Sequence, residues 1–351
     1  MLSKDQEQHA AEGSIAIQSA GDVTVTTTGL SYSEVRDVAL DTFNANFYKF
    51  ADTAGKLATA RAEEITEKFL SKLQKEAPAG LGKSQDPDFQ YALLTVQKEY
   101  AKSGDENLGD LLVDLLVDRS KQEKREILQI VLNEALNTAP KLTDSQLAVL
   151  AIVFLFRYTQ NNGIGSHQNF GEYLDKFATP FVSKIVKNQA CYQHLEFSGC
   201  GSISVGTFPL PKQFGTTYQG LFVKGFDQQE IIASNISIGL DQRFFIQCLN
   251  DSSKIQVKAL NKDQLEASFE AHALAKGDRD KIAALFDVGK MGDAEIIDKC
   301  VSIRPYMVDL FENWSGSPMK NLTLTSVGIA IGHANIKRFA GEFANLSIWI
   351  N

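Results

Sequence analysis

A proline-free stretch from Ser31 to Ala77 carries apolar side chains at steps of three or four residues, and no other feature constrains the fold as strongly. This spacing places the apolar side chains on one face of an α-helix. Ser31 and Glu34 form an S-x-x-E capping box at its start. If it is unbroken, the stretch forms a helix of about 45 residues, roughly 70 Å long. Its apolar positions, interrupted at Arg61, are Val35, Ala39, Phe43, Phe47, Phe50, Ala54, Leu57, Ile65, Phe69 and Leu73. The Ala- and Thr-rich middle, residues 52–64, is compatible with a close helix–helix contact or with a break.

Residues 13–29, GSIAIQSAGDVTVTTTG, alternate apolar and small polar side chains with the period of a β-strand. Ala20-Gly21-Asp22 supplies a turn between two short strands. A lone hairpin is marginally stable in water, so its apolar face needs a partner, either the rest of the chain or the same segment of other copies. The candidate self-association residues are Ile15, Ile17, Gln18, Gly21, Asp22, Val23 and Val25.

Helical patterns with short connections continue from Pro87 to about residue 187. Ser120 with Glu123 and Thr143 with Gln146 have the spacing of two further capping boxes. From Cys191 onward short strand-like segments are mixed with helices, and residues 345–350 resemble a terminal strand. We therefore expect a mainly α protein, a helical array with one very long N-terminal helix, plus short β segments at the N-terminus and in the C-terminal half. The expected divisions are an arm (1–30), an α-helical domain (31–190) and a mixed α/β domain (191–351).

The charge balance argues against a nucleic-acid-binding protein. The 351 residues include 35 Lys and Arg against 43 Asp and Glu, a net charge of −8, whereas such proteins usually have a basic excess. The longest charge-free apolar run, Leu147–Phe156, is about half the length a membrane span needs. The first dozen residues contain no apolar core of a signal peptide. We therefore expect a cytoplasmic protein without a membrane span.

Standard catalytic signatures for nucleotide binding, serine hydrolysis and zinc proteolysis are missing from the sequence. Cys191-x-x-His194, with Cys200 six residues later, has the spacing closest to a metal site. Zinc normally takes four ligands, and no second pair follows at a suitable distance. Burial of the two cysteines as small core residues is the simpler interpretation, so we expect no cofactor.

Two other features invite a functional interpretation. His167 follows the glycine loop Gly163-Ile164-Gly165, and His333 lies in an apolar segment, but the sequence assigns neither of them a catalytic partner. Asp110, Asp114 and Asp118 recur every fourth residue on one helical face, which we interpret as a solvated stripe.

The segment AIQSAGDVTV followed by GLSYSEVRDVALDTFNANFY resembles an uncharacterised bacterial family with locus-style names. The resemblance continues through DPDFQYALLTVQKEYAKSGDENLGDLLVDLLVDR and NEALNTAPKLTDSQLAVLAIVFLFRY, most of residues 14–160. Similar leaders precede varied domains in bacterial conflict proteins, some of them amyloid-type signalling motifs. Here Ala20 replaces a frequent glycine and the usual asparagines are missing, which favours plain β-mediated oligomerisation. The resemblance supplies no catalytic residues.

These observations favour an oligomeric, non-catalytic scaffold or sensor assembled through the N-terminal β segment, in bacterial anti-phage defence. The expected partners are other copies of the chain, or another protein bound by that segment, and not nucleic acid. One alternative is an enzyme or toxic effector with a site at Cys191, His194 and Cys200 or at the His167 loop. Another is a membrane-acting effector through residues 322–331. The sequence does not decide whether the protein is an enzyme.

Overall fold

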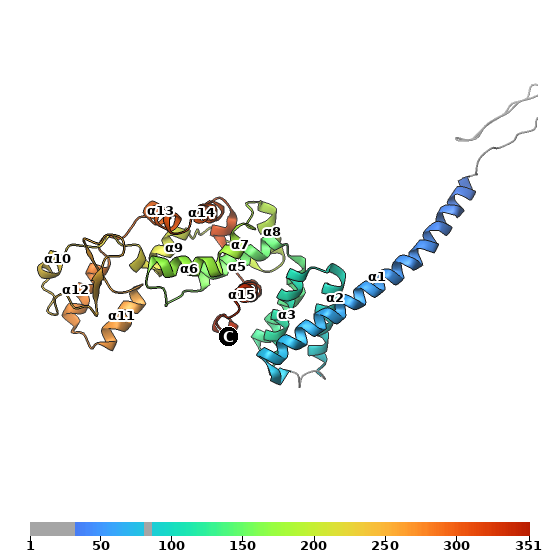
Figure 1. Ribbon diagram of the computed structural model, residues 1–351, viewed down its shortest axis with the longest axis horizontal. Helices are drawn as coiled ribbons and strands as arrows, with labels where there is room; N and C mark the ends of the chain where they lie inside the picture. The colour runs from blue at the N-terminus through green and yellow to red at the C-terminus, as the bar shows by residue number, and fades with distance from the viewer. Residues whose placement is uncertain (1–31, 81–85) are drawn as a thin grey trace, which may run out of the picture. The chain divides into compact units, whose positions relative to one another are not determined.

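The computed structural model describes residues 32–80 and 86–351, with side chains described from residue 51. It is mainly helical with two small sheets, which confirms the expected fold class (Figure 1). The predicted β segment at residues 13–29 lies outside the described residues. By its contacts the chain divides into two units, residues 1–57 and 58–351.

Helix α1 (Tyr32–Glu76) runs unbroken for 45 residues, which decides between the one long helix and the break that the sequence left open. From residue 61 onward its buried face consists of Ile65, Phe69 and Leu73, one turn apart. The ring of Phe69 packs in a tilted orientation against the ring of Phe89 on α2 (Pro87–Ser103), with 5.9 Å between the ring centroids. Residues 51–60 are exposed apart from half-buried Ala58. The Ala- and Thr-rich middle is therefore not a break. Its first part is mostly exposed, whereas Arg61 donates to the carbonyl of Ala101 on α2.

The next helices form the expected array. These are α3 (Glu106–Ser120), α4 (Ile127–Thr138), the 3-10 turn η2 (Ala139–Lys141) and α5 (Asp144–Tyr158). Thr143 and Gln146 cap α5 reciprocally, as predicted. The capping box predicted at Ser120 and Glu123 is wrong, because Ser120 is buried at the end of α3 and its hydroxyl donates to the carbonyl of Leu116. Helix α4 instead begins at Ile127, without a side-chain cap.

The remainder of the chain is more helical than its glycine- and proline-rich sequence suggests. Its helices are α6 (His167–Phe177), α7 (Thr179–Val182), α8 (Gln189–Phe197), α9 (Leu210–Thr217), α10 (Gln228–Ala233), α11 (Lys262–Ala271), α12 (Lys276–Phe286), α13 (Asp293–Ile303), α14 (Met307–Ser315) and α15 (Ser326–Ala340), with the 3-10 turns η3 (Gln219–Leu221), η4 (Pro318–Asn321) and η5 (Leu346–Ile348). The terminal strand predicted at residues 345–350 is wrong. This segment forms η5 because Leu346 and Ile350 are buried in the core and Trp349 donates its indole N–H to the carbonyl of Tyr158 at 2.7 Å.

Both sheets are antiparallel pairs of three-residue strands. Strand β1 (Gly201–Ile203) pairs with β4 (Leu322–Leu324), with Ser202 opposite Thr323. Strand β2 (Phe245–Gln247) pairs with β3 (Ile255–Val257), with Ile246 opposite Gln256. Helices α10, α11 and α12 lie together around the second pair (Figure 1).

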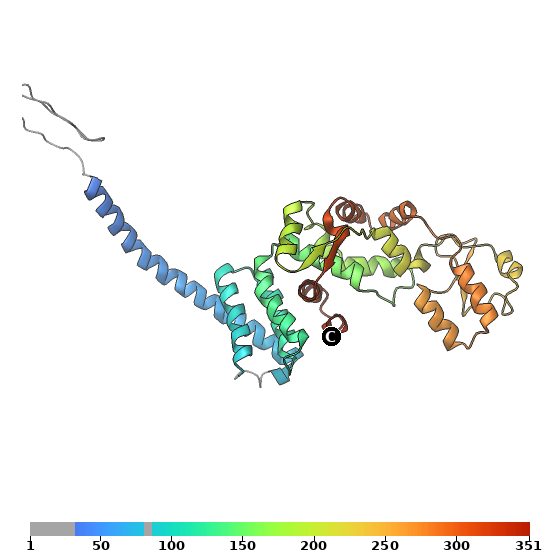
Figure 2. The same cartoon turned by 180° about the vertical axis from the view of Figure 1, so that it is seen from behind.

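Two hydrophobic cores organise residues 58–351. The larger core takes side chains from both sides of residue 190, from Ile65 to Ile350. The smaller core, within residues 226–286, is built around Phe244, Phe245 and Phe269. The division at residues 190 and 191 stays a prediction, while α15, near the end of the chain, packs against α3, α4 and α5 of the helical array. Figure 2 shows α15 from behind, with the C-terminus beside it.

Candidate functional site

The predicted self-association residues, Ile15 to Val25, lie outside the described residues. Self-association through this segment therefore stays a prediction.

The candidates Cys191 and His194 on α8, and Cys200 just after it, are used in packing. Cys200 is buried, and burial raises the pKa of its thiol to about 12. Burial also raises the pKa of Cys191. The Nδ1 of His194 lies 2.9 Å from the amide nitrogen of Gln146. Within residues 32–80 and 86–351 no group of three His, Cys, Asp or Glu side chains is arranged to hold a metal ion.

The two other histidine candidates are bonded to backbone carbonyls. The Nε2 of His167 donates to the carbonyl of Leu221 at 2.9 Å, and that of His333 donates to the carbonyl of Ala344 at 2.7 Å. Burial lowers the pKa of both imidazoles. His333 is enclosed by the rings of Phe154, Phe343 and Trp349. Each imidazole therefore holds a backbone carbonyl, and neither is paired with a carboxylate in the hydrogen bonds of the described residues.

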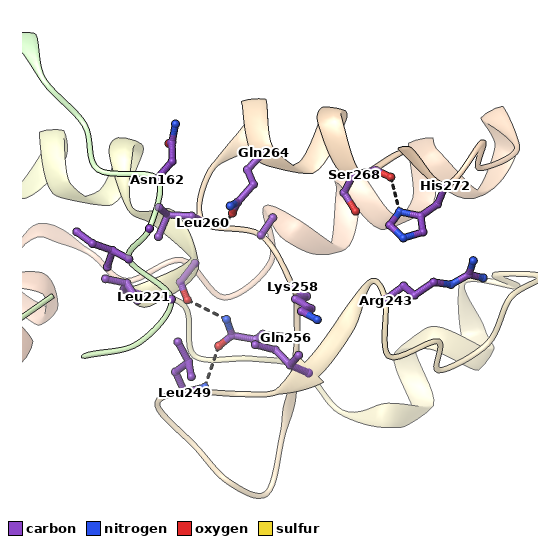
Figure 3. Close-up of a pocket in the computed structure, with 16 residues that line it drawn as sticks. Asn162, Leu221, Arg243, Leu249, Gln256, Lys258, Leu260, Gln264, Ser268 and His272 are labelled. Atoms are coloured by element: carbon purple, nitrogen blue, oxygen red, sulfur yellow. Dashed lines mark hydrogen bonds between the residues drawn. The ribbon is translucent and has the colours of Figure 1, made fainter. Parts of the chain in front are cut away.

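The glycine loop before His167 nevertheless forms part of a cavity of about 420 Å³, shown in Figure 3. Residues 162–165 face the β2–β3 pair, the segment that follows it, and α11 across this pocket. Ile164, Leu221 and Leu260 belong to the larger core, whereas β2 and β3 carry the smaller one. The pocket thus lies where the two cores meet, a common position for ligand sites.

Backbone contacts fix the wall of this pocket. The N–H of Gly220 donates to the carbonyl of Leu260 at 2.9 Å, and a Cβ at Gly220 would overlap the carbonyl of Ala259, so only glycine allows this approach. Buried Gln256 donates to the carbonyl of Gly220 at 2.8 Å and accepts from the N–H of Leu249 at 2.9 Å (Figure 3). Each polar end of Gln256 has a partner, so its burial carries no unpaired polar group.

Arg243, Lys258 and His272 lie at the same end of the pocket, away from Leu221 and Leu260 (Figure 3). Arg243 pairs with Asp241 through Nε at 3.0 Å and a terminal nitrogen at 2.6 Å. These hydrogen bonds lower the pKa of Asp241 to about 2. His272 donates from Nδ1 to the carbonyl of Ser268 at 2.9 Å, which leaves Nε2 free of that bond. No Asp or Glu is among the described residues that line the cavity.

Sequence reasoning identified the glycine loop of this pocket but missed Arg243, Lys258 and His272. The three residues are separated in sequence and follow no motif, so no sequence signal could have grouped them.

The expectation that the aspartates of α3 form a solvated stripe is wrong for two of the three. Asp110 is exposed, but Asp114 and Asp118 are buried against α1 and α15 instead of solvated. The Nζ of Lys337 lies 3.1 Å from Asp118 and 3.0 Å from Glu76, while Lys121 lies 2.7 Å from Asp118. Burial opposes ionisation of Asp118, yet the charges of Lys337 and Lys121 outweigh it and hold its pKa below the usual value. Lys337 thus joins α15 both to α3 and to the end of α1.

None of the helices in the described parts of the chain is both long and apolar enough to cross a membrane.

Fold and site together define a mainly α-helical protein with a cation-rimmed pocket between two cores. A family model described only as ":-like" matches residues 29–350. The chain belongs to this uncharacterised, locus-named family. The match begins at Gly29, after the alternating residues of the β segment. No curated protein and no solved structure matches the chain.

Proposed function

We propose that this protein is a non-catalytic, oligomeric scaffold or sensor that assembles through its N-terminal β segment, in bacterial antiviral defence. The observation that carries the proposal is the exposed surface of α1. Its residues 51–60 are exposed apart from half-buried Ala58, and Leu57 keeps 51% of its surface in solvent. In the sequence, Leu57 continues an apolar stripe that begins at Val35.

A stripe of this kind on a long helix is typical of helices that pack against other helices. Other copies of the chain are the partner to which we commit, because the β segment directly before the helix favours pairing with itself. Strand edges offer unpaired N–H and C=O groups to an identical segment. The β segment and the helix would then act in one assembly.

The enzyme alternative has less support. Its proposed site at Cys191, His194 and Cys200 contains thiols whose pKa burial raises, and such thiols are poor nucleophiles and metal ligands. His167 is committed to the carbonyl of Leu221. The membrane alternative assigned insertion to residues 322–331, but these form β4 and the first part of α15, whose apolar side chains are mostly buried in the larger core.

The solution mass of the full chain, measured by light scattering, tests the proposal against a chain lacking residues 1–29. We expect a multimer for the full chain and a smaller species for the truncated one. Val25→Lys should also give the smaller species, since it places a charge on the predicted apolar face of the strand. Thr26→Lys, on the opposite face, is the matched control and should leave the mass unchanged.

A monomeric full chain would reject the proposal, and a truncated chain of unchanged stoichiometry would reject assembly through the β segment. The defence role is tested by phage plating on bacteria that express the chain. Plating should fall with the full chain and with Thr26→Lys, and recover with Val25→Lys.

A further inference from the structure

We propose that the pocket between the glycine loop 162–165 and α11 binds a small molecule that carries an anionic group on an apolar body. The inference deepens the proposed function, and rests on it in one respect: the ligand would be the signal of a sensor. The binding itself is argued from the pocket alone.

The charged side chains that line the pocket are all basic. Arg243 and Lys258 line it together with His272, and no carboxylate is among its described lining residues. This contrasts with the chain as a whole, whose net charge is −8. It also contrasts with a second cavity of about 570 Å³, where Lys212, Lys262 and Lys290 are accompanied by Asp263 and Asp293. The 420 Å³ pocket therefore favours an anion, and the second cavity has no such preference.

Lys258 is the cation best placed to meet a ligand. Its backbone is fixed by the hydrogen bond from its N–H to the carbonyl of Phe244, at 2.8 Å. Its side chain is exposed and has no ion-pair partner in residues 51–80 and 86–351. Arg243 is partly neutralised, because Asp241 occupies its Nε and one terminal nitrogen. An incoming anion would thus meet one free ammonium and one guanidinium with a remaining N–H edge.

The apolar part of the lining selects the rest of the ligand. Leu221 and Leu260 lie away from the cations (Figure 3), and Ile164, Ile246 and Leu249 add apolar surface to the pocket. A volume of about 420 Å³ falls within the range of small-molecule sites. Gly165 adds an exposed backbone with open space around its Cα, and its N–H has no partner among the described residues. A ligand with an apolar body and one anionic end satisfies both ends of the pocket.

Two dyes of nearly the same shape separate the anionic group from the apolar body. The probe is 8-anilinonaphthalene-1-sulfonate, and its uncharged counterpart is N-phenyl-1-naphthylamine. Fluorescence titration of the full chain should detect binding of the sulfonate. Lys258→Met should weaken that binding about five- to tenfold, the loss expected for one charge-assisted contact. The uncharged dye should change by less than about twofold, because its contacts are apolar.

Lys276→Met is the matched control, since Lys276 is exposed on α12 outside the pocket and should leave both affinities unchanged. Lys258 is a cleaner target than Arg243, whose removal would leave Asp241 without its partner.

Competition then distinguishes the sources of the anion. Displacement of the sulfonate dye by adenosine monophosphate would identify a phosphate ester, and displacement by octanoate would identify a carboxylate. Equal sulfonate affinity in Lys258→Met and the unaltered chain, or no displacement by either competitor, would overturn the inference. Light scattering of the same samples keeps the two proposals separate: dye binding by a monomer would reject only the proposed assembly, and a multimer without dye binding would reject only the ligand site.

Discussion

The Nζ of Lys72 lies 2.6 Å from Oδ1 of Asp114, whose side chain is only 1% exposed. One turn earlier on the same two helices, Lys68 lies 3.7 Å from Asp110, and both side chains are more than one-third exposed. The two pairs join α1 to α3 with the same chemistry at different burial. Comparing the two pairs therefore measures how burial changes the contribution of an ion pair to the free energy of unfolding.

We expect Lys72→Met to destabilise residues 58–351 by about 1–3 kcal/mol, because it leaves the buried Asp114 with only Lys337, at 3.8 Å. Burial already raises the pKa of Asp114, so protonation of the carboxylate limits the loss. Lys68→Met is the control and should cost about 1 kcal/mol or less. Melting temperatures of both variants measure the difference, and equal losses would show that burial of Asp114 is irrelevant.

A second prediction concerns the close approach of α15 to its neighbours. A Cβ on Gly328 would overlap the carbonyl oxygen of Cys200, and one on Gly332 would lie 2.7 Å from the carbonyl oxygen of Leu150. We expect Gly328→Ala to destabilise by about 1–3 kcal/mol, since the backbone must shift. Gly277→Ala, in a helix with open space around the same position, should be neutral or stabilising by up to about 1 kcal/mol. Thermal unfolding of both variants tests this, and a Gly328→Ala chain as stable as the original would contradict the packing.

The acid stability of the protein should depend on His333. Its Nε2–H donates to Ala344, its Nδ1 is buried without a partner among the described residues, and burial lowers its pKa. The folded state therefore binds the proton less tightly than the unfolded state. The resulting stability is fully present above the unfolded pKa of about 6.5 and is lost as the pH falls toward the folded value. Lys337 and Lys121 also lower the pKa of His333, whereas the hydrogen bond to Ala344 and the charge of Asp118 oppose the shift without reversing it.

His333→Gln keeps a donor for Ala344 but cannot titrate. We expect the melting temperature of the unaltered chain to fall more steeply than that of His333→Gln between pH 7 and pH 5. His167 contributes with the same sign in both proteins. Asp114 acts in the opposite sense, because its raised pKa gives stability at low pH that is lost as the pH rises through the folded value. His272→Gln, an exposed histidine, is the control. Parallel pH profiles of the unaltered chain and His333→Gln would contradict the prediction.

Local signals allowed much of the helical part to be predicted. The helical character of α1, the ends of α2 beside Pro87 and Gly104, and the capping box at Thr143 each depend on residues a few positions apart. The errors at the Ser120 cap and at the C-terminal segment arose where distant residues decide. Ser120 has the side chain of a cap, but α3 buries it. The segment ending in Trp349 has the composition of a strand, but aromatic packing against Phe154 bends it into η5.

The pocket and the ion pairs could not be predicted for the same physical reason. Asp110, Asp114 and Asp118 recur every fourth residue, which is the spacing of a solvated helical face. The partners of Asp114, Lys72 and Lys337, lie on two other helices. The rim of the pocket joins Lys258 to a glycine loop almost a hundred residues earlier. Only tertiary packing brings these groups together.

The final prediction concerns Gly220, because the pocket wall packs so closely against it that there is no room for a side chain. Its N–H bonds to Leu260 and its carbonyl accepts from Gln256, while a Cβ would overlap the carbonyl of Ala259. Gly220→Ala should push the segment 258–260 outward, and with it Lys258. We expect weaker binding of 8-anilinonaphthalene-1-sulfonate by about tenfold, together with a loss of about 1–3 kcal/mol in stability. Gly277→Ala, on α12 outside the pocket, is the control, since nothing lies within 4 Å of its Cβ position. It should not lower the melting temperature and should alter dye affinity by less than about twofold. Dye binding that survives Gly220→Ala at full affinity would mean that the dye binds elsewhere on the protein.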